Sequence, residues 1–240
     1  RERFGKAWKA ELPEAGLNAF GILEGIEAGK VKFLYLAATN PLTFPNATRW
    51  RKALEKVDFL VVQDILPTEV TKLAKVVLPG AAWAEKGGSV TSLDHRVRSL
   101  EKAISSPGES LEDWEILAGL FARLQKQSVS VSRSEILSEV SSLSSLYGDI
   151  GFAGEERNRP CLKQPYRPAD KGFHYQTPIV EEVEVGLQLV SGKSIYHFGT
   201  TSTWSAGPLE IENQGVICVS PADAVTAGIV DGARVKLTSR

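Results

Sequence analysis

The chain has 240 residues, of which 42% are hydrophobic and 24% charged, as in folded globular proteins. Its 28 Lys and Arg balance 29 Asp and Glu, so the net charge of −1 provides no basic surface for nucleic acid or an anionic membrane. Cys161 and Cys218 are too few for a disulfide framework or a thiolate cluster, and no apolar run is long enough to span a bilayer. We therefore expect no nucleic-acid binding and no direct membrane insertion. Because the chain begins with Arg1 and contains no Met, we also expect it to be part of a longer polypeptide.

Residues 17 to 125 alternate between helical and strand patterns. "AFGILEGIEAGK" has helical spacing, and the apolar run "VKFLYLAATNP" is typical of a buried parallel strand. "TRWRKALEKV" predicts the next helix. Phe59 to Val62 predicts a second buried strand, followed by a turn and a helix in "LPTEVTKLAK". "VVLPGAAWAEKGGSVTS" predicts a third strand, and residues 109–124 and "SRSEILSEVSSLSSLYG" predict helices. This alternation indicates an α/β domain over residues 1–147 with a doubly wound, mainly parallel sheet.

The pattern changes in the second half of the chain. Residues 148–180 are rich in Gly, Pro, Arg and Lys without periodicity, which predicts a linker. Residues 181–240 contain short strand patterns separated by turn residues, as in a small β-barrel. These strands are too few to close a barrel, so the domain is expected to be partial. "SPADA" predicts a helix start with Ser220 as its N-cap.

Polar residues follow each of the three predicted parallel strands, at the edge where open sheets bind ligands. Each group alone is weak evidence, because Asn-Pro and Gly-Gly are ordinary turn sequences and a Thr or Asp often caps a helix. Three groups together favour a shared ligand. Asp64 is the most informative, since a carboxylate accepts hydrogen bonds from ribose or from the N–H groups of guanine. No GxGxxG or P-loop sequence is present, so a nucleotide would be bound in another way. The polar residues after the three predicted strands are, in chain order, Thr39 and Asn40, then Gln63, Asp64 and Thr68, then Glu85, Gly87, Gly88 and Ser89.

The stretch "SGKSIYHFGTTSTWS" combines glycines, hydroxyl side chains and basic residues. Such a loop either caps its own backbone or grips a polar ligand. His197 is explained equally well as a core histidine and Lys193 as a solvated turn residue. Gly199, Thr200 and Ser202 favour a ligand, because open backbone N–H groups and hydroxyls suit a pyrophosphate or the edge of a pterin.

With these motifs the chain resembles the molybdopterin-dinucleotide oxidoreductases, which include formate dehydrogenases, nitrate reductases and the G-type large iron-sulfur subunit of NADH:quinone oxidoreductase. The resemblance is carried by "GILEGIEAGKVKFLYLAATNP", "VVQDILPTEVTKLAKVVLPGAAWAEKGGSVTSLDHRVR", "PGESLEDWEILAGLFARL" and "SGKSIYHFGTTSTWS" with "VSPADAVTAGIVDGARVKLTS". It implies that molybdopterin guanine dinucleotide lies between the α/β domain and the barrel. Neither a catalytic residue nor a metal ligand is implied in this chain, because the metal ligand and the iron-sulfur cluster cysteines lie upstream in the family. The implied cofactor contacts are Asn40, Asp64, Thr68 and Gly88 at the guanine end, and Gly192, Lys193, His197, Thr200 and Ser202 on the pterin and phosphate side.

The chain also departs from the family pattern. Lys193 stands where many relatives have Arg, and "SVTSLDHRVR" lacks an Asn that is usual there. These departures favour the large-subunit type of NADH:quinone oxidoreductase, with the cofactor cleft intact or vestigial. One alternative is a molybdenum formate dehydrogenase or related reductase that binds two pterin-guanine dinucleotides. The other is a non-catalytic structural module of a respiratory complex. The expected partners are other subunits of the complex and the upstream part of the same polypeptide, and the expected location is the cytoplasm, peripheral to the inner membrane.

Overall fold

The computed structural model describes residues 1–92, 97–126, 130–144, 147, 187, 189–190, 192, 194–196, 199–212 and 215–238. The chain divides into two compact units, Arg1–Asp170 and Lys171–Arg240. This division falls within the stretch predicted to be a linker, residues 148–180, which itself lies outside the described residues. The predicted domain limits stay a prediction.

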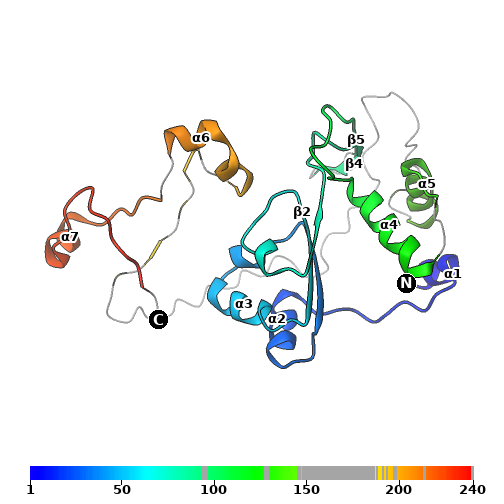
Figure 1. Ribbon diagram of the computed structural model, residues 1–240, viewed down its shortest axis with the longest axis horizontal. Helices are drawn as coiled ribbons and strands as arrows, with labels where there is room; N and C mark the ends of the chain where they lie inside the picture. The colour runs from blue at the N-terminus through cyan, green and yellow to red at the C-terminus, as the bar shows by residue number, and fades with distance from the viewer. Residues whose placement is uncertain are drawn as a thin grey trace, which may run out of the picture. The chain divides into compact units, whose positions relative to one another are not determined.

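The first unit contains a parallel sheet and an antiparallel strand pair (Figure 1). The parallel strands run in the order β1-β2-β3, with Phe33 paired to Phe59 and Val61 to Val76. This arrangement confirms the mixed α/β class with parallel strands, whereas the β4-β5 pair was not predicted. The strands are β1 (Phe33–Ala37), β2 (Phe59–Asp64), β3 (Val76–Pro79), β4 (Gly88–Thr91) and β5 (Val97–Leu100), and the helices are α1 (Glu2–Trp8), α2 (Ala19–Glu27), α3 (Ala47–Leu54), α4 (Asp113–Gln125) and α5 (Arg133–Leu143).

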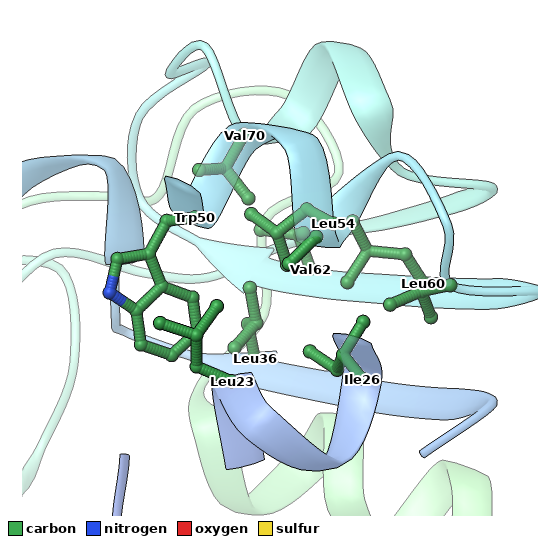
Figure 2. Close-up of a cluster of buried hydrophobic side chains, with 10 residues drawn as sticks. Leu23, Ile26, Leu36, Trp50, Leu54, Leu60, Val62 and Val70 are labelled. Carbon is green, nitrogen blue, oxygen red and sulfur yellow. The ribbon is translucent and has the colours of Figure 1, made fainter. Parts of the chain in front are cut away.

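One face of the parallel sheet packs against α2 and α3, which contact each other. Alternate strand residues point to this face, because successive side chains of a strand lie on opposite sides. Figure 2 shows the strands and the two helices contributing to one apolar cluster. Burying each of these side chains stabilises the fold by about 1.5–3 kcal/mol. The core includes Leu23, Ile26, Leu36, Trp50, Leu54, Leu60, Val62 and Val70.

The opposite face of the sheet is exposed at its amino end and, along β2, buried toward its carboxyl end. At its amino end the rings of Phe33 and Phe59 stack with centroids 6.0 Å apart and stay exposed. Val61 and Gln63 of β2 are buried, and the Gln63 amide bonds to Asp113 at the start of α4. The carboxyl end of this face is therefore covered by the beginning of α4.

Two predicted helices differ from the structure. The predicted helix after Asp64 is wrong, because the structure has only a 3-10 turn, η2 (Thr71–Leu73). Residues 65–75 alone connect β2 to β3, and the β-branched side chains in this short connection disfavour a helix. The helix expected from residue 109 begins at Asp113, because Glu112 is its N-cap and exchanges capping-box hydrogen bonds with Glu115.

The second unit contains the 3-10 turn η3 (Thr201–Trp204) and the helices α6 (Ala206–Ile211) and α7 (Pro221–Ala227). Ser220 caps α7 as predicted, since its hydroxyl accepts a hydrogen bond from the N–H of Asp223. The described residues of this unit form no strand, so the partial β-barrel over residues 181–240 stays a prediction. Across both units, none of the helices within the described ranges has the length and apolar character needed to cross a membrane.

Candidate functional site at the carboxyl edge of the sheet

The first two parallel strands end side by side. Ala37 pairs with Gln63, and the N–H of Ala38 donates to the Gln63 carbonyl at 2.8 Å. Asn40, which follows β1, and Asp64, which ends β2, therefore lie at the same edge of the sheet, as predicted. Ala38 has a φ of 49°, a left-handed conformation that costs an L-residue about 1–2 kcal/mol. Strain of this kind gathers at binding sites, so it favours a functional role for this edge.

The side chains of Asn40 and Asp64 are held by the turns that they begin. Asn40 Oδ1 accepts from the N–H of Leu42 at 3.0 Å. Asp64 Oδ1 accepts from the N–H of Ile65 at 2.7 Å and from that of Leu66 at 3.4 Å. No group in the described part of the chain bonds the second carboxylate oxygen of Asp64. Each side chain is thus oriented through one polar atom, and Asp64 keeps a charged acceptor for another partner.

Thr68 lies in the turn that follows Asp64. Its side chain is 8% exposed, and its hydroxyl has no hydrogen-bond partner within the residues that the structure describes. A buried hydroxyl without a partner costs about 1–3 kcal/mol. Both main-chain polar groups of Thr68 are hydrogen-bonded: its N–H donates to the carbonyl of Leu66, and its carbonyl accepts from the hydroxyl of Thr71. The turn that follows β2 therefore contains a buried hydroxyl that no described residue satisfies.

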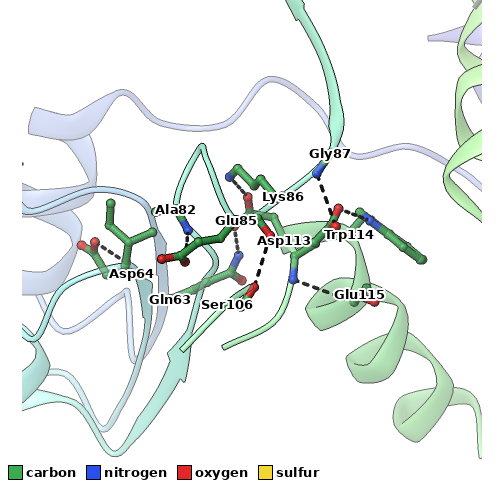
Figure 3. Close-up of polar contacts among 12 residues, drawn as sticks. Gln63, Asp64, Ala82, Glu85, Lys86, Gly87, Ser106, Asp113, Trp114 and Glu115 are labelled. Atoms are coloured by element: carbon green, nitrogen blue, oxygen red, sulfur yellow. Dashed lines mark hydrogen bonds and ion pairs between the residues drawn. The ribbon is translucent and has the colours of Figure 1, made fainter. Parts of the chain in front are cut away.

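A chain of hydrogen bonds joins the edge to the start of α4 (Figure 3). The hydroxyl of Tyr35 donates to Gln63 Oε1, and Gln63 Nε2 donates to Asp113 Oδ1 at 2.6 Å. Lys86 Nζ lies 2.5 Å from Asp113 Oδ2. Because Gln63 is only 4% exposed, both ends of its amide need these partners.

The surroundings of Asp113 and Tyr35 favour an ionised Asp113 and a neutral Tyr35 in this chain of hydrogen bonds. Burial opposes ionisation of Asp113, but hydrogen bonds from Lys86 and Gln63 outweigh it and hold the pKa of the carboxyl below its usual range. Asp113 is also the first residue of α4, where the helix dipole favours a negative charge. Burial and the charge of Asp113 raise the pKa of Tyr35. At neutral pH Tyr35 is therefore a donor and Asp113 an acceptor.

Gly88 begins β4 with a φ of 155°, a conformation that residues with side chains rarely adopt. A Cβ atom at Gly88 would meet no atom within 4 Å, so the space on that side of its Cα is open. The preceding loop is fixed: Glu85 accepts from the N–H of Ala82 at 2.9 Å, and the N–H of Gly87 donates to Glu112 at 3.4 Å. The turn is held in place, with open space beside the Cα of its second glycine.

In the second unit, the hydroxyls of Ser202 and Thr203 in the Gly/Thr/Ser loop bond to their own turn. Ser202 is 8% exposed and donates to the carbonyl of Gly199 at 2.7 Å. Thr203 donates to the carbonyl of Thr200 at 2.6 Å. Backbone capping, one of the two interpretations of the sequence, accounts for these contacts.

The other contacts predicted in the second unit are Gly192, Lys193 and His197. Gly192 is exposed, and a Cβ atom there would meet nothing within 4 Å. Lys193 and His197 lie outside the described residues. The pterin-side contacts therefore stay a prediction. The described residues hold no group of three or more His, Cys, Asp or Glu that suits a metal ion.

Sequence reasoning missed three residues of the edge. Asp113 looks like any acid in the first turn of a helix, so its bond to Gln63 has no local signature. Tyr35 reads as one apolar residue of a buried strand. Lys86 directly precedes the two glycines, and this position was the one available signal that it belongs to the site.

Residues 11–123 match the family model for molybdopterin oxidoreductase. The chain is 40% identical, over 98% of its length, to NADPH-Fe(3+) oxidoreductase subunit alpha of Geobacter sulfurreducens. It is 33% identical over 99% of its length to F420-dependent formate dehydrogenase subunit alpha of Methanocaldococcus jannaschii, and 28% identical over its whole length to an NADH-quinone oxidoreductase subunit of Rhizobium meliloti.

The chain spans only part of these relatives: 28% of the Geobacter and Rhizobium proteins and 39% of the Methanocaldococcus protein. All three carry the name of an oxidoreductase or dehydrogenase subunit. The matched residues include both Asn40 and Asp64, together with Lys86 and Asp113. Residues 11–123 of the chain thus form a molybdopterin oxidoreductase domain.

Proposed function

We propose that the chain is part of the large subunit of a multi-subunit molybdopterin oxidoreductase, and that the carboxyl edge of its sheet binds the guanine end of molybdopterin guanine dinucleotide. The observation that carries this proposal is the turn after β2. It combines a carboxylate oxygen of Asp64 that the described residues leave unbonded with the buried, unpartnered hydroxyl of Thr68.

The chemistry of guanine suits these groups. Its ring N–H and amino group both donate hydrogen bonds, and a carboxylate accepts two such bonds side by side. Adenine presents an acceptor in place of the ring N–H, so it fits an aspartate poorly. Asn40 would contribute its amide from the loop after the neighbouring strand, and the open side of Gly88 would leave room for the nucleotide.

The bound cofactor would supply the redox chemistry, while this chain would bind and orient it. The metal ligand and the iron-sulfur clusters belong, on this proposal, to parts of the enzyme outside these residues. The pterin and phosphate side would meet Gly192, Lys193, His197, Thr200 and Ser202, presented by the predicted barrel. Other subunits are the expected partners. They would hold the protein in the cytoplasm at the inner membrane.

Two types of electron-transfer enzyme are supported. The first draws electrons from a nicotinamide nucleotide, as the names of the Geobacter and Rhizobium relatives indicate for those proteins, and the 40% identity to the Geobacter protein favours it. The second is a formate dehydrogenase, favoured by 33% identity to the Methanocaldococcus protein over 99% of the chain. Identity to the Rhizobium relative is lower, at 28%.

Metal analysis and pterin fluorescence on the natively purified protein test the proposal. We expect molybdenum or tungsten together with a pterin, and reduction of the protein by NADPH, NADH or formate. Reduction by formate alone selects the formate dehydrogenase type. A well-folded native preparation without metal and pterin contradicts cofactor binding and favours a structural module.

A further inference from the structure

The loop that carries Gly87 and Gly88 is tied to the edge of the sheet through one carboxylate. Asp113 accepts from Gln63 of β2 on one oxygen and from Lys86 of the loop on the other. The backbone N–H of Gly87 donates to Glu112, the residue before Asp113. Two consecutive loop residues are therefore bonded to two consecutive residues at the start of α4.

Asp113 and the main chain of Asp64 both border Gly80. A Cβ atom placed on Gly80 would be 3.6 Å from Asp113 Oδ1 and 3.8 Å from the carbonyl oxygen of Asp64. Gly80 in turn donates its N–H to that carbonyl at 3.0 Å. The carboxylate that holds the glycine turn thus sits at the end of β2, next to the candidate guanine-binding aspartate.

The direction of the hydrogen bonds requires an ionised carboxylate at this position. Tyr35 donates to Gln63, whose buried amide then directs its N–H groups at Asp113, and Lys86 donates from the other side. An amide at residue 113 accepts the bond from Gln63 but turns its own N–H groups toward the ammonium of Lys86. Asp113→Asn therefore keeps the link to β2 and breaks the link to the loop through Lys86.

We propose that Asp113 is a positioning residue, which through Lys86 fixes the Gly87–Gly88 turn beside the carboxyl edge so that the open side of Gly88 faces the bound nucleotide. Its effect on a ligand rests on the proposed function, whereas its effect on the loop does not. The guanidinium of Arg133 packs against Gly87: a Cβ atom on Gly87 would lie 1.6 Å from the Arg133 guanidinium. Loop movement would therefore also displace Arg133.

Two measurements on the full chain test this role. Amide hydrogen exchange of the peptide spanning residues 86–90 reports the loop without any ligand. The affinity for GDP reports the site. Asp113→Asn and Lys86→Gln should accelerate exchange in this peptide and weaken GDP binding by about tenfold, the lower end of what the loss of an outer partner costs at a metal site. Lys86→Arg keeps the charge and should restore both readouts.

Lys102→Gln is the matched control, because Lys102 is exposed and bonds only Ser106 among the described residues. It should leave exchange and GDP affinity unchanged. Unaltered exchange in Asp113→Asn overturns the positioning role, as does faster exchange with full GDP affinity. If the unaltered protein fails to bind GDP, the proposed function fails, and exchange alone decides whether Asp113 holds the loop.

Discussion

Replacing Thr68 by Val separates stability from binding at the edge of the sheet. Val has nearly the same shape as Thr but no hydroxyl. Because the Thr68 hydroxyl is buried without a partner in the described residues, its removal should raise the free energy of unfolding by about 1–2 kcal/mol. For a domain of this size, that gain corresponds to a rise in Tm of about 2–8 °C.

The same change should weaken ligand binding, since the hydroxyl would no longer be available to a nucleotide. Thermal melts with and without GDP measure both effects on one sample. Thr71→Val is the matched control: the Thr71 hydroxyl donates to the Thr68 carbonyl at 2.7 Å, so its loss should lower stability by about 1 kcal/mol. A Thr68→Val protein that melts below the unaltered protein, or one that keeps its full GDP protection, refutes this reasoning.

Three further changes test the local physics of the first unit. Gly88→Ala should destabilise the β4-β5 pair by about 1–2 kcal/mol in chemical denaturation, because of the φ of 155°, whereas Gly16→Ala should be nearly neutral. Lys126→Gly should raise Tm, with a gain of about 1 kcal/mol, because Lys126 ends α4 in a left-handed conformation. Glu27→Gln should flatten the loss of stability in acid: the hydrogen bond from Arg49 lowers the pKa of Glu27, so its contribution is present at neutral pH and lost as pH falls through the lowered pKa.

A specific result would contradict each of these three predictions. Equal stability of the Gly88→Ala and Gly16→Ala proteins contradicts the backbone assignment at Gly88. A Lys126→Gly protein that melts no higher than Lys126→Ala contradicts the left-handed helix end. An unchanged acid limb of the stability curve in Glu27→Gln shows that the contact between Glu27 and Arg49 contributes nothing measurable.

The buried strands were predictable because their pattern is local. Leu60, Val61 and Val62 are apolar on both faces, which distinguishes a central parallel strand from a half-exposed one. The N-cap at Ser220 was equally predictable, since the cap, the proline and the acid follow one another in sequence. The helix expected after Asp64 failed because periodicity ignores how few residues connect β2 to β3.

The candidate site was only half predictable, for a physical reason. Asn40 follows β1 and Asp64 ends β2, and the carboxyl ends of parallel strands meet at one edge whatever the details of packing. The role of Asp113 depends on where α4 begins relative to β2, and tertiary contacts alone fix that. The strained backbone at Ala38 likewise has no sequence signature, because alanine is common in every conformation with negative φ.

Discrimination between GDP and ADP by the carboxylate of Asp64 tests the central claim most directly. Asp64→Asn keeps the Oδ1 acceptor that orders the turn and removes the charge that pairs with guanine. Asp58→Asn, an exposed site before the amino end of β2, is the control. We predict that GDP, and not ADP, raises the Tm of the unaltered and Asp58→Asn proteins and fails to do so for Asp64→Asn. Equal protection by both nucleotides, or protection that survives Asp64→Asn, contradicts guanine binding at this edge.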